Sequence, residues 1–190
     1  MIHPDTRLVH ISDEIGMGIV ATAFLPKGTI TWVQDAFDQV FHPSQLSSFP
    51  GHFQPTLEKY TFRNRDGLMV LCWDAAKYMN HSCVPTCLGT EFGFEIAIRD
   101  IHPGEELTDD YATFFMQPED QFDCYCGTPE CRTAVRPEDL NYCAPRWEKL
   151  MKEALPFSYQ VPQKMSNLLN PGLIEKAQKE IIFSNKRKTG

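Results

Sequence analysis

The chain has 190 residues, 42% of them hydrophobic, and a formal net charge of −7. This length suits one domain with a small addition, and the apolar content excludes a disordered chain. No run reaches the ~18 apolar residues that a membrane helix needs, and the N-terminal residues lack the apolar core of a signal peptide. We therefore expect a soluble, intracellular, monomeric protein of the cytoplasm or nucleus, with no membrane partner.

The charge is unevenly distributed along the chain. Residues 91–140 hold 13 Asp and Glu against 3 Lys and Arg, whereas residues 141–190 hold 4 against 9. A solvated acidic surface is the ordinary explanation, and a field that attracts a basic peptide is the more specific one. Direct nucleic-acid binding is not expected, because it requires a basic stripe, and Lys186-Arg187-Lys188 is too short to supply one.

The first part of the chain predicts short strands separated by turns. Residues 19–21 and 30–33 are β-like and are split by Pro26-Lys27-Gly28. Residues 42–56 contain His42-Pro43, Pro50-Gly51 and Pro55 and predict a loop or irregular stretch. Residues 60–62 and 68–71 predict a hairpin across Asp66-Gly67.

The second part changes from strand to helix periodicity. Residues 94–98 alternate as a half-buried strand does, and residues 107–111 form a further predicted strand after Pro103-Gly104. After Pro137, apolar residues recur at helical spacing: Trp147, Leu150, Met151 and Ala154, then Leu173, Ile174, Ala177 and Ile181. Pro145 and Pro171 mark expected helix starts. We expect a mainly β body with a helical C-terminal segment packed against it.

The seven cysteines indicate a metal site. An odd count without a secretory signal argues against a disulfide scaffold. Three thiols fall within eight residues as Cys124-x-Cys126-x4-Cys131, and structural zinc takes four such ligands in a tetrahedron. The alternative is three buried free cysteines. A fourth ligand must come from elsewhere, and the candidates are Cys83, Cys87, Cys72 and Cys143.

Other short motifs are weak when taken singly. An Asn80-His81 pair is more often a satisfied buried polar pair than a catalytic one, and Tyr111 alone suits a core tyrosine. Gly16-Met17-Gly18 lacks the third glycine of a dinucleotide loop. In their order along the chain, however, the motifs of residues 7–133 resemble the SET-domain protein-lysine N-methyltransferases. The matching segments are Gly16-Met17-Gly18, Lys27-Gly28, Tyr60-Thr61-Phe62, Asn80-His81-Ser82-Cys83, the stretch from Gly104 to Tyr111, and the cysteine knuckle, which resembles the family's post-SET element.

The resemblance implies a SET-type fold of short strands and small sheets with a threaded loop, in a small stand-alone member of the family. It divides the chain into a SET domain (1–120), a post-SET zinc knuckle (121–136) and a helical segment (137–190). It implies that S-adenosyl-L-methionine is held, mostly through backbone groups, by Gly16, Met17, Gly18, Asn80, His81 and Tyr111. It implies one structural zinc ion on Cys83, Cys124, Cys126 and Cys131.

Methyl transfer to lysine requires a neutral amine, whereas a free lysine has a pKa of about 10.4. An apolar channel and a neighbouring sulfonium both disfavour the ammonium form, so alignment is the remaining requirement. The resemblance assigns catalysis to the hydroxyl of Tyr111, with Tyr60 as a second polar contact and Phe62 in the channel wall. The alternative for Tyr60 is an ordinary cross-strand core aromatic.

Two departures from the family pattern bear on activity. Asp109 is assigned to the substrate channel region, at a position that is usually Phe or Tyr in the family, and residues 31–35 lack the usual Glu-Tyr-x-Gly element. Asp109 either points to solvent, which we expect, or faces the channel and stabilises a charged lysine. The sequence therefore predicts methyl transfer to lysine in a basic, histone-like protein or peptide. A catalytically silent SET module that binds a peptide or cofactor is the alternative, and a zinc-dependent interaction domain is a third possibility.

Overall fold

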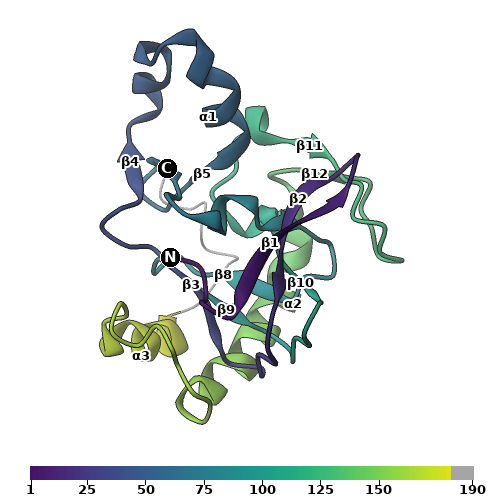
Figure 1. Ribbon diagram of the computed structural model, residues 1–190, viewed down its shortest axis with the longest axis vertical. Helices are drawn as coiled ribbons and strands as arrows, with labels where there is room; N and C mark the ends of the chain where they lie inside the picture. The colour runs from purple at the N-terminus through teal and green to yellow at the C-terminus, as the bar shows by residue number, and fades with distance from the viewer. Residues whose placement is uncertain (181–190) are drawn as a thin grey trace.

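The computed structural model describes residues 1–180, and short strands in small sheets make up most of its body (Figure 1). This confirms the predicted mainly β class. The largest sheet has four strands in the order β1-β2-β10-β7. They are β1 (Thr6–Ser12), β2 (Gly16–Ala21), β10 (Glu106–Asp109) and β7 (Asn80–His81). β7 runs parallel to β10, with Asn80 beside Thr108 and His81 beside Asp109, so this sheet brings together segments that lie far apart in the sequence.

A second sheet forms the buried centre of the body. It has the order β3-β9-β8, with β3 (Ile30–Val33), β9 (Phe94–Ala97) and β8 (Cys87–Gly89). Every residue of these strands is buried, as expected for a sheet covered on both faces. The predicted strands 19–21 and 30–33 are confirmed, and they belong to different sheets.

The third sheet holds the predicted hairpin. β4 (Gln39–Phe41), β6 (Met69–Leu71) and β5 (Thr61–Arg63) pair in the order β4-β6-β5, and β5 and β6 are antiparallel neighbours. The loop predicted for residues 42–56 is wrong, because η1 (Pro43–Ser48), η2 (Gly51–Phe53) and the first residues of α1 (Gln54–Tyr60) occupy it. The prolines occupy first-turn positions of η1 and α1, where their fixed φ favours a helix. Tyr60 therefore ends a helix and does not begin a strand.

Three short 3-10 turns connect these sheets to the rest of the body: η3 (Ala75–Tyr78), η4 (Tyr111–Thr113) and η5 (Pro118–Asp120). The predicted strand 107–111 ends early, since β10 stops at Asp109 and Tyr111 opens η4. β11 (Phe122–Asp123) and β12 (Ala134–Val135) pair with each other and enclose the cysteine knuckle.

The C-terminal segment contains α2 (Asp139–Ala154), η6 (Leu155–Tyr159) and α3 (Pro171–Glu180). Pro171 opens α3 as predicted, whereas Pro145 lies inside α2, so the helix start predicted there is wrong. An interior proline costs about 3 kcal/mol, and burial of one face of α2 offsets this cost. That face comprises Leu140, Ala144, Trp147, Met151 and Ala154. Ile181 and the basic run 186–188 lie outside the described residues.

The helical segment and the β body share one core. Trp147 and Met151 of α2 are buried in the same cluster as Leu88, Phe94 and Ile96 of β8 and β9. Packing of the C-terminal segment against the body is therefore confirmed for the described part of the chain, and α2 crosses behind the central strands in Figure 1. Within residues 1–180, the helices are too short or too polar to cross a membrane.

Candidate active site and metal centre

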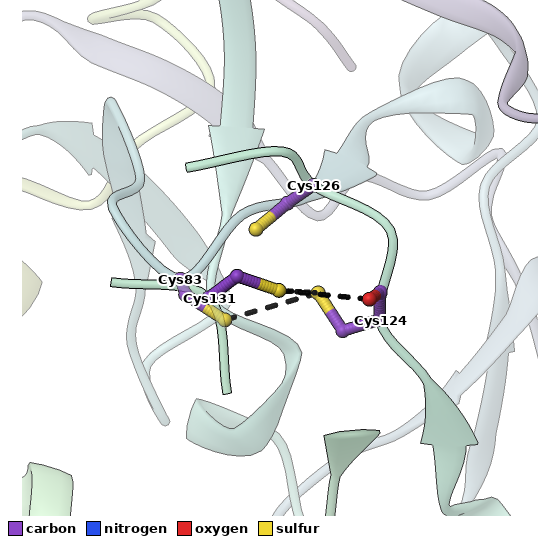
Figure 2. Close-up of side chains that lie close together, drawn as sticks. All are labelled: Cys83, Cys124, Cys126 and Cys131. Carbon is purple, nitrogen blue, oxygen red and sulfur yellow. Dashed lines mark hydrogen bonds between the residues drawn. The ribbon is translucent and has the colours of Figure 1, made fainter. Parts of the chain in front are cut away.

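Four thiols converge from two parts of the chain. Cys83 follows β7, and Cys124, Cys126 and Cys131 come from the knuckle between β11 and β12. Their sulfur atoms point toward one another (Figure 2) and lie within 4.8 Å of one another. The Sγ of Cys124 is 3.8 Å from that of Cys83 and 3.7 Å from that of Cys131. A zinc ion with Zn–S bonds of ~2.3 Å in a tetrahedron requires S···S distances of ~3.8 Å, so this group has the geometry of a zinc site.

The structure thus selects one of the four candidates for the fourth ligand. Cys83 joins the cluster, whereas Cys72, Cys87 and Cys143 do not belong to it. Backbone N–H groups of Arg132 and Thr133 lie 3.4 Å from the sulfurs of Cys83 and Cys131. Such donors stabilise thiolates, which are the form that binds a metal.

A buried ion pair ties the knuckle to the body. The guanidinium of Arg132 donates to both carboxylate oxygens of Asp110, at 2.7 and 3.0 Å. Trp147 of α2 also donates its Nε1–H to Asp110, at 3.2 Å. Asp110 is 1% exposed, so three segments meet at one carboxylate. The sequence alone assigned no role to Asp110, although it directly precedes Tyr111 in the matching motif. No sequence pattern indicated that Arg132 and Trp147 contact it.

Asn80 connects the glycine turn of residues 16–18 to β10 by two hydrogen bonds. Its Nδ2 donates to the carbonyl of Met17 at 3.0 Å and to Glu106 Oε1 at 2.7 Å. Gly18 lies under this contact, where an added Cβ would be 2.5 Å from Glu106 Oε1. Gly16 has φ +85°, a conformation that other residues rarely adopt. The two glycines therefore make the turn and its close packing possible.

His81 and Tyr111 contact each other directly. The N–H of Tyr111 donates to His81 Nδ1 at 3.2 Å, and the Tyr111 hydroxyl donates to the carbonyl of Met79. Burial, with a smaller effect of Arg132, lowers the pKa of His81 to about 3, so the ring is neutral. Burial also raises the pKa of Tyr111, which keeps its hydroxyl protonated.

These residues line one cavity of about 930 Å³, at the upper end of the range for small-molecule sites. The expected site residues on its wall are Met17, Tyr60, Phe62, Asn80, His81, Asp109 and Tyr111. The knuckle contributes Phe122, Cys124 and Cys126. Gly16 and Gly18 do not line the cavity; they shape the turn that presents Met17.

Part of the wall is a continuous row of aromatic rings. Ring centroids are 5.8 Å apart between Trp32 and Phe62, 4.9 Å between Phe62 and Phe114, and 5.7 Å both between Phe114 and Tyr111 and between Tyr111 and Phe122. A second hollow of about 480 Å³ shares Trp32, Phe62 and Phe114 with the first. Aromatic faces attract cations, so an ammonium group suits this wall. No sequence motif marked Trp32, Phe114 or Phe122.

Asp109 does not point to solvent, and that expectation is wrong. It is 1% exposed and lines the cavity. The reason is that β10 is an inner strand, held between β2 and β7. Burial raises the pKa of Asp109 well above its ordinary value, and the nearby charges of Glu95 and Asp110 add to this effect.

The fold and site together define a small β protein in which a cluster of four thiols, able to hold a metal ion, lies beside an aromatic-walled cavity. The family model of the SET domain matches residues 16–112, just over half of the 190 residues. The chain therefore belongs to the SET domain family.

Several named proteins resemble the chain. It is 45% identical over 67 residues to histone-lysine N-methyltransferase TRX1 of Oryza sativa subsp. japonica, covering 32% of this chain and 6% of that protein. It is 36% identical over 85 residues to the H3 lysine-4 specific histone-lysine N-methyltransferase of Schizosaccharomyces pombe, covering 40% of this chain and 9% of that protein. It is 39% identical over 64 residues to human histone-lysine N-methyltransferase 2D, covering 30% and 1%. The matched stretch is thus less than a tenth of each relative's length.

Proposed function

We propose that this protein transfers a methyl group from S-adenosyl-L-methionine to a lysine side chain of a protein substrate. One observation carries the proposal: Asn80, His81 and the hydroxyl-bearing Tyr111 line the same cavity as a row of aromatic rings suited to an ammonium group. Membership of the SET family and relatives that are named histone-lysine N-methyltransferases support it.

The residues that would hold the cofactor are Met17, Asn80, His81 and Tyr111, from the wall of the cavity, with Gly16 and Gly18 shaping the turn beneath Met17. The amide of Asn80 and Nδ1 of His81 are already hydrogen-bonded inside the protein. These residues therefore act mainly through their backbone groups and by fixing the wall. When bound, the cofactor supplies a methyl group activated by its sulfonium.

The chain itself aligns the lysine. Tyr111 is the proposed catalytic residue, and its hydroxyl is held by the carbonyl of Met79. Phe62 supplies part of the channel wall. Tyr60, the last residue of α1, lines the cavity and packs edge-on against Tyr78, with ring centroids 5.1 Å apart. Its hydroxyl is the proposed second polar contact. The aromatic faces attract the incoming ammonium, and exclusion of water together with the sulfonium charge of the bound cofactor then favours loss of its proton.

A zinc ion on Cys83, Cys124, Cys126 and Cys131 would fix the knuckle against β7 and hold Cys124 and Cys126 in the cavity wall. The proposed role of zinc is structural, since all four positions are thiols and a catalytic zinc keeps one position open. The proposed substrate is a basic, histone-like protein or peptide, because residues 91–140 carry a large acidic excess.

The test is transfer of a labelled methyl group from S-adenosyl-L-methionine to core histones and to a lysine-rich lysate. Wild-type protein is expected to label lysine. Tyr111→Phe should reduce labelling at least tenfold, since a positioned hydroxyl is lost. The matched control is Tyr142→Phe, on an 81% exposed side chain of α2, which should label as the wild type does. Cofactor binding without any labelled lysine would favour the silent binding module instead.

A further inference from the structure

Two buried carboxyl groups lie close together in the wall of the cavity. Glu95 of β9 is 7% exposed and Asp109 of β10 is 1% exposed, and both line the cavity. Their side chains lie within hydrogen-bonding reach of each other. Gly89 lies opposite Glu95 in the sheet, and a Cβ on it would be 2.9 Å from Asp109 Oδ2. The missing side chain of Gly89 therefore leaves the space in which the two carboxyls meet.

The pair retains one proton and carries one negative charge. A carboxylate is only an acceptor, so a hydrogen bond between two carboxyls requires a shared proton, and like charges at this separation do not both form. The side chains that act electrostatically on the pair are Asp110, Tyr111, Cys72 and Cys87, and none of them is a cation. The positive amine of Met1 lowers the pKa of Glu95, but burial has the larger effect and raises it.

The pair keeps room to accept further hydrogen bonds. Among residues 1–180, Glu95 Oε2 and Asp109 Oδ2 are buried and have no hydrogen-bond donor apart from the proton that the pair shares. Asp109 Oδ1, by contrast, accepts the N–H of Asp110 at 2.6 Å. The shared proton occupies one lone pair of each oxygen, and the charged pair keeps further acceptor sites, so it suits a ligand that brings N–H groups. The two carboxyls share the cavity with the aromatic wall, which favours a cation.

On the basis of the proposed function, we propose that Glu95 and Asp109 together accept a proton from the lysine ammonium of the substrate and hold the resulting amine for methylation. The ammonium gives one proton to the pair, which becomes two neutral carboxylic acids, and the nitrogen keeps its lone pair. That lone pair forms the N–C bond to the methyl group while the C–S bond breaks and leaves its electrons on sulfur. The positive charge passes from sulfur to the methylated nitrogen, and the pair later releases its proton to water.

The physical reason for the transfer is the cost of buried charge. An ammonium beside a carboxylate inside the protein costs several kcal/mol of desolvation for each ion. A neutral amine beside a neutral acid avoids this cost. The same pair that attracts the ammonium to the cavity therefore also removes its proton there.

The first test is the pH dependence of kcat/KM for methyl transfer to a lysine peptide. With the pair intact, the ammonium form is the reacting substrate, so kcat/KM should be level between about pH 7.5 and 9.5, below the lysine pKa of about 10.4. Glu95→Gln keeps the shape, and its remaining carboxyl, Asp109, stays protonated because burial raises its pKa, so this variant cannot accept the proton. In Glu95→Gln, kcat/KM should rise about tenfold per pH unit, as the fraction of free amine does, and should be about a hundredfold lower at pH 8.

The second test needs no cofactor. Binding of n-butylammonium, which mimics the end of a lysine side chain, is measured by calorimetry at pH 7. Wild-type protein should bind it at least tenfold more tightly than Glu95→Gln. The matched control for both tests is Asp38→Asn, because Asp38 is a buried carboxyl that accepts the N–H of Trp73 and does not line the cavity. It should behave as the wild type does.

The outcomes separate the inference from the function on which it rests. Equal pH slopes in the wild type and Glu95→Gln, or equal affinity for n-butylammonium, would overturn the inference and leave methyl transfer intact. A wild type that methylates no lysine would overturn the proposed function, and the inference with it. A level wild-type kcat/KM, a tenfold rise per pH unit in Glu95→Gln and weakened cation binding in that variant together support it.

Discussion

The buried pair of Asp110 and Arg132 should be a main source of stability, and Asp110→Asn tests this. The substitution keeps the volume of the side chain but removes its charge. It leaves the guanidinium of Arg132 without its two-point partner and places an amide among donors from Arg132 and Trp147. Breaking a buried pair on one side typically costs about 3–5 kcal/mol.

The expected loss lies near 3 kcal/mol, at the low end of that range. Arg132 is 19% exposed and keeps Asp139 at 3.3 Å, so part of its charge remains compensated. For a chain of this size, this loss lowers Tm by about 6–12 °C. The assay is urea unfolding followed by tryptophan fluorescence, with saturating zinc and with the zinc content measured in parallel.

The control for this variant is Glu180→Gln, which breaks the exposed contact of Glu180 with Lys176 on α3, at 3.9 Å. An exposed pair of this kind contributes about 0–1 kcal/mol, so the control should unfold nearly as the wild type does. A loss below about 1 kcal/mol in Asp110→Asn, with zinc retained, would refute the view that this carboxylate joins the knuckle, the body and α2.

Three further outcomes are expected. Elemental analysis should find about one equivalent of zinc per chain in the wild type and none in Cys131→Ser, since structural sites need all four ligands. The control Cys143→Ser should keep its zinc. A wild type that is folded and free of zinc would contradict the metal site. Burial raises the pKa of Glu95 from 4.5 to about 7, so the folded protein holds a proton that the unfolded chain has released. The contribution of this group to stability is full below about pH 4.5 and is lost as pH rises through 7, by on the order of 3 kcal/mol. Urea titrations at several pH values should show a flatter dependence in Glu95→Gln. Trp147→Ala should cost about 3–5 kcal/mol in the same assay, because Trp147 is 2% exposed, and a loss near zero would mean that α2 is not part of the core.

Much of the fold followed from local pattern. The hairpin of β5 and β6 has its own turn residues, and the buried strands β3 and β9 are rich in apolar residues, so both could be predicted. β1 was missed, because its side chains are exposed or half-buried without alternation. Its place is set by pairing with β2. The prolines led to two wrong predictions. Pro43 and Pro55 lie in the first turns of η1 and α1, where a loop was expected, and Pro145 lies inside α2, where a helix start was expected.

The candidate site divides in the same way. The spacing of the three knuckle cysteines predicts a metal site, but it does not identify the fourth ligand. The structure and the family resemblance both indicate Cys83. The partnership of Glu95 with Asp109 depends on two strands from different sheets and on a glycine between them. No local sequence pattern predicts this contact between the two carboxyls. The usual exposure of aspartate led to the wrong expectation that Asp109 faces solvent.

Cys124 and Cys126 belong both to the metal cluster and to the cavity wall. Binding of zinc to the thiol cluster and binding of a ligand in the cavity are therefore expected to affect each other, and such an effect is reciprocal. If zinc strengthens the binding of a cavity ligand by some factor, that ligand must strengthen zinc binding by the same factor. A molecule seated in the cavity would then protect the thiols from chelators and oxidants, and a chelator would weaken binding in the cavity without touching Tyr111.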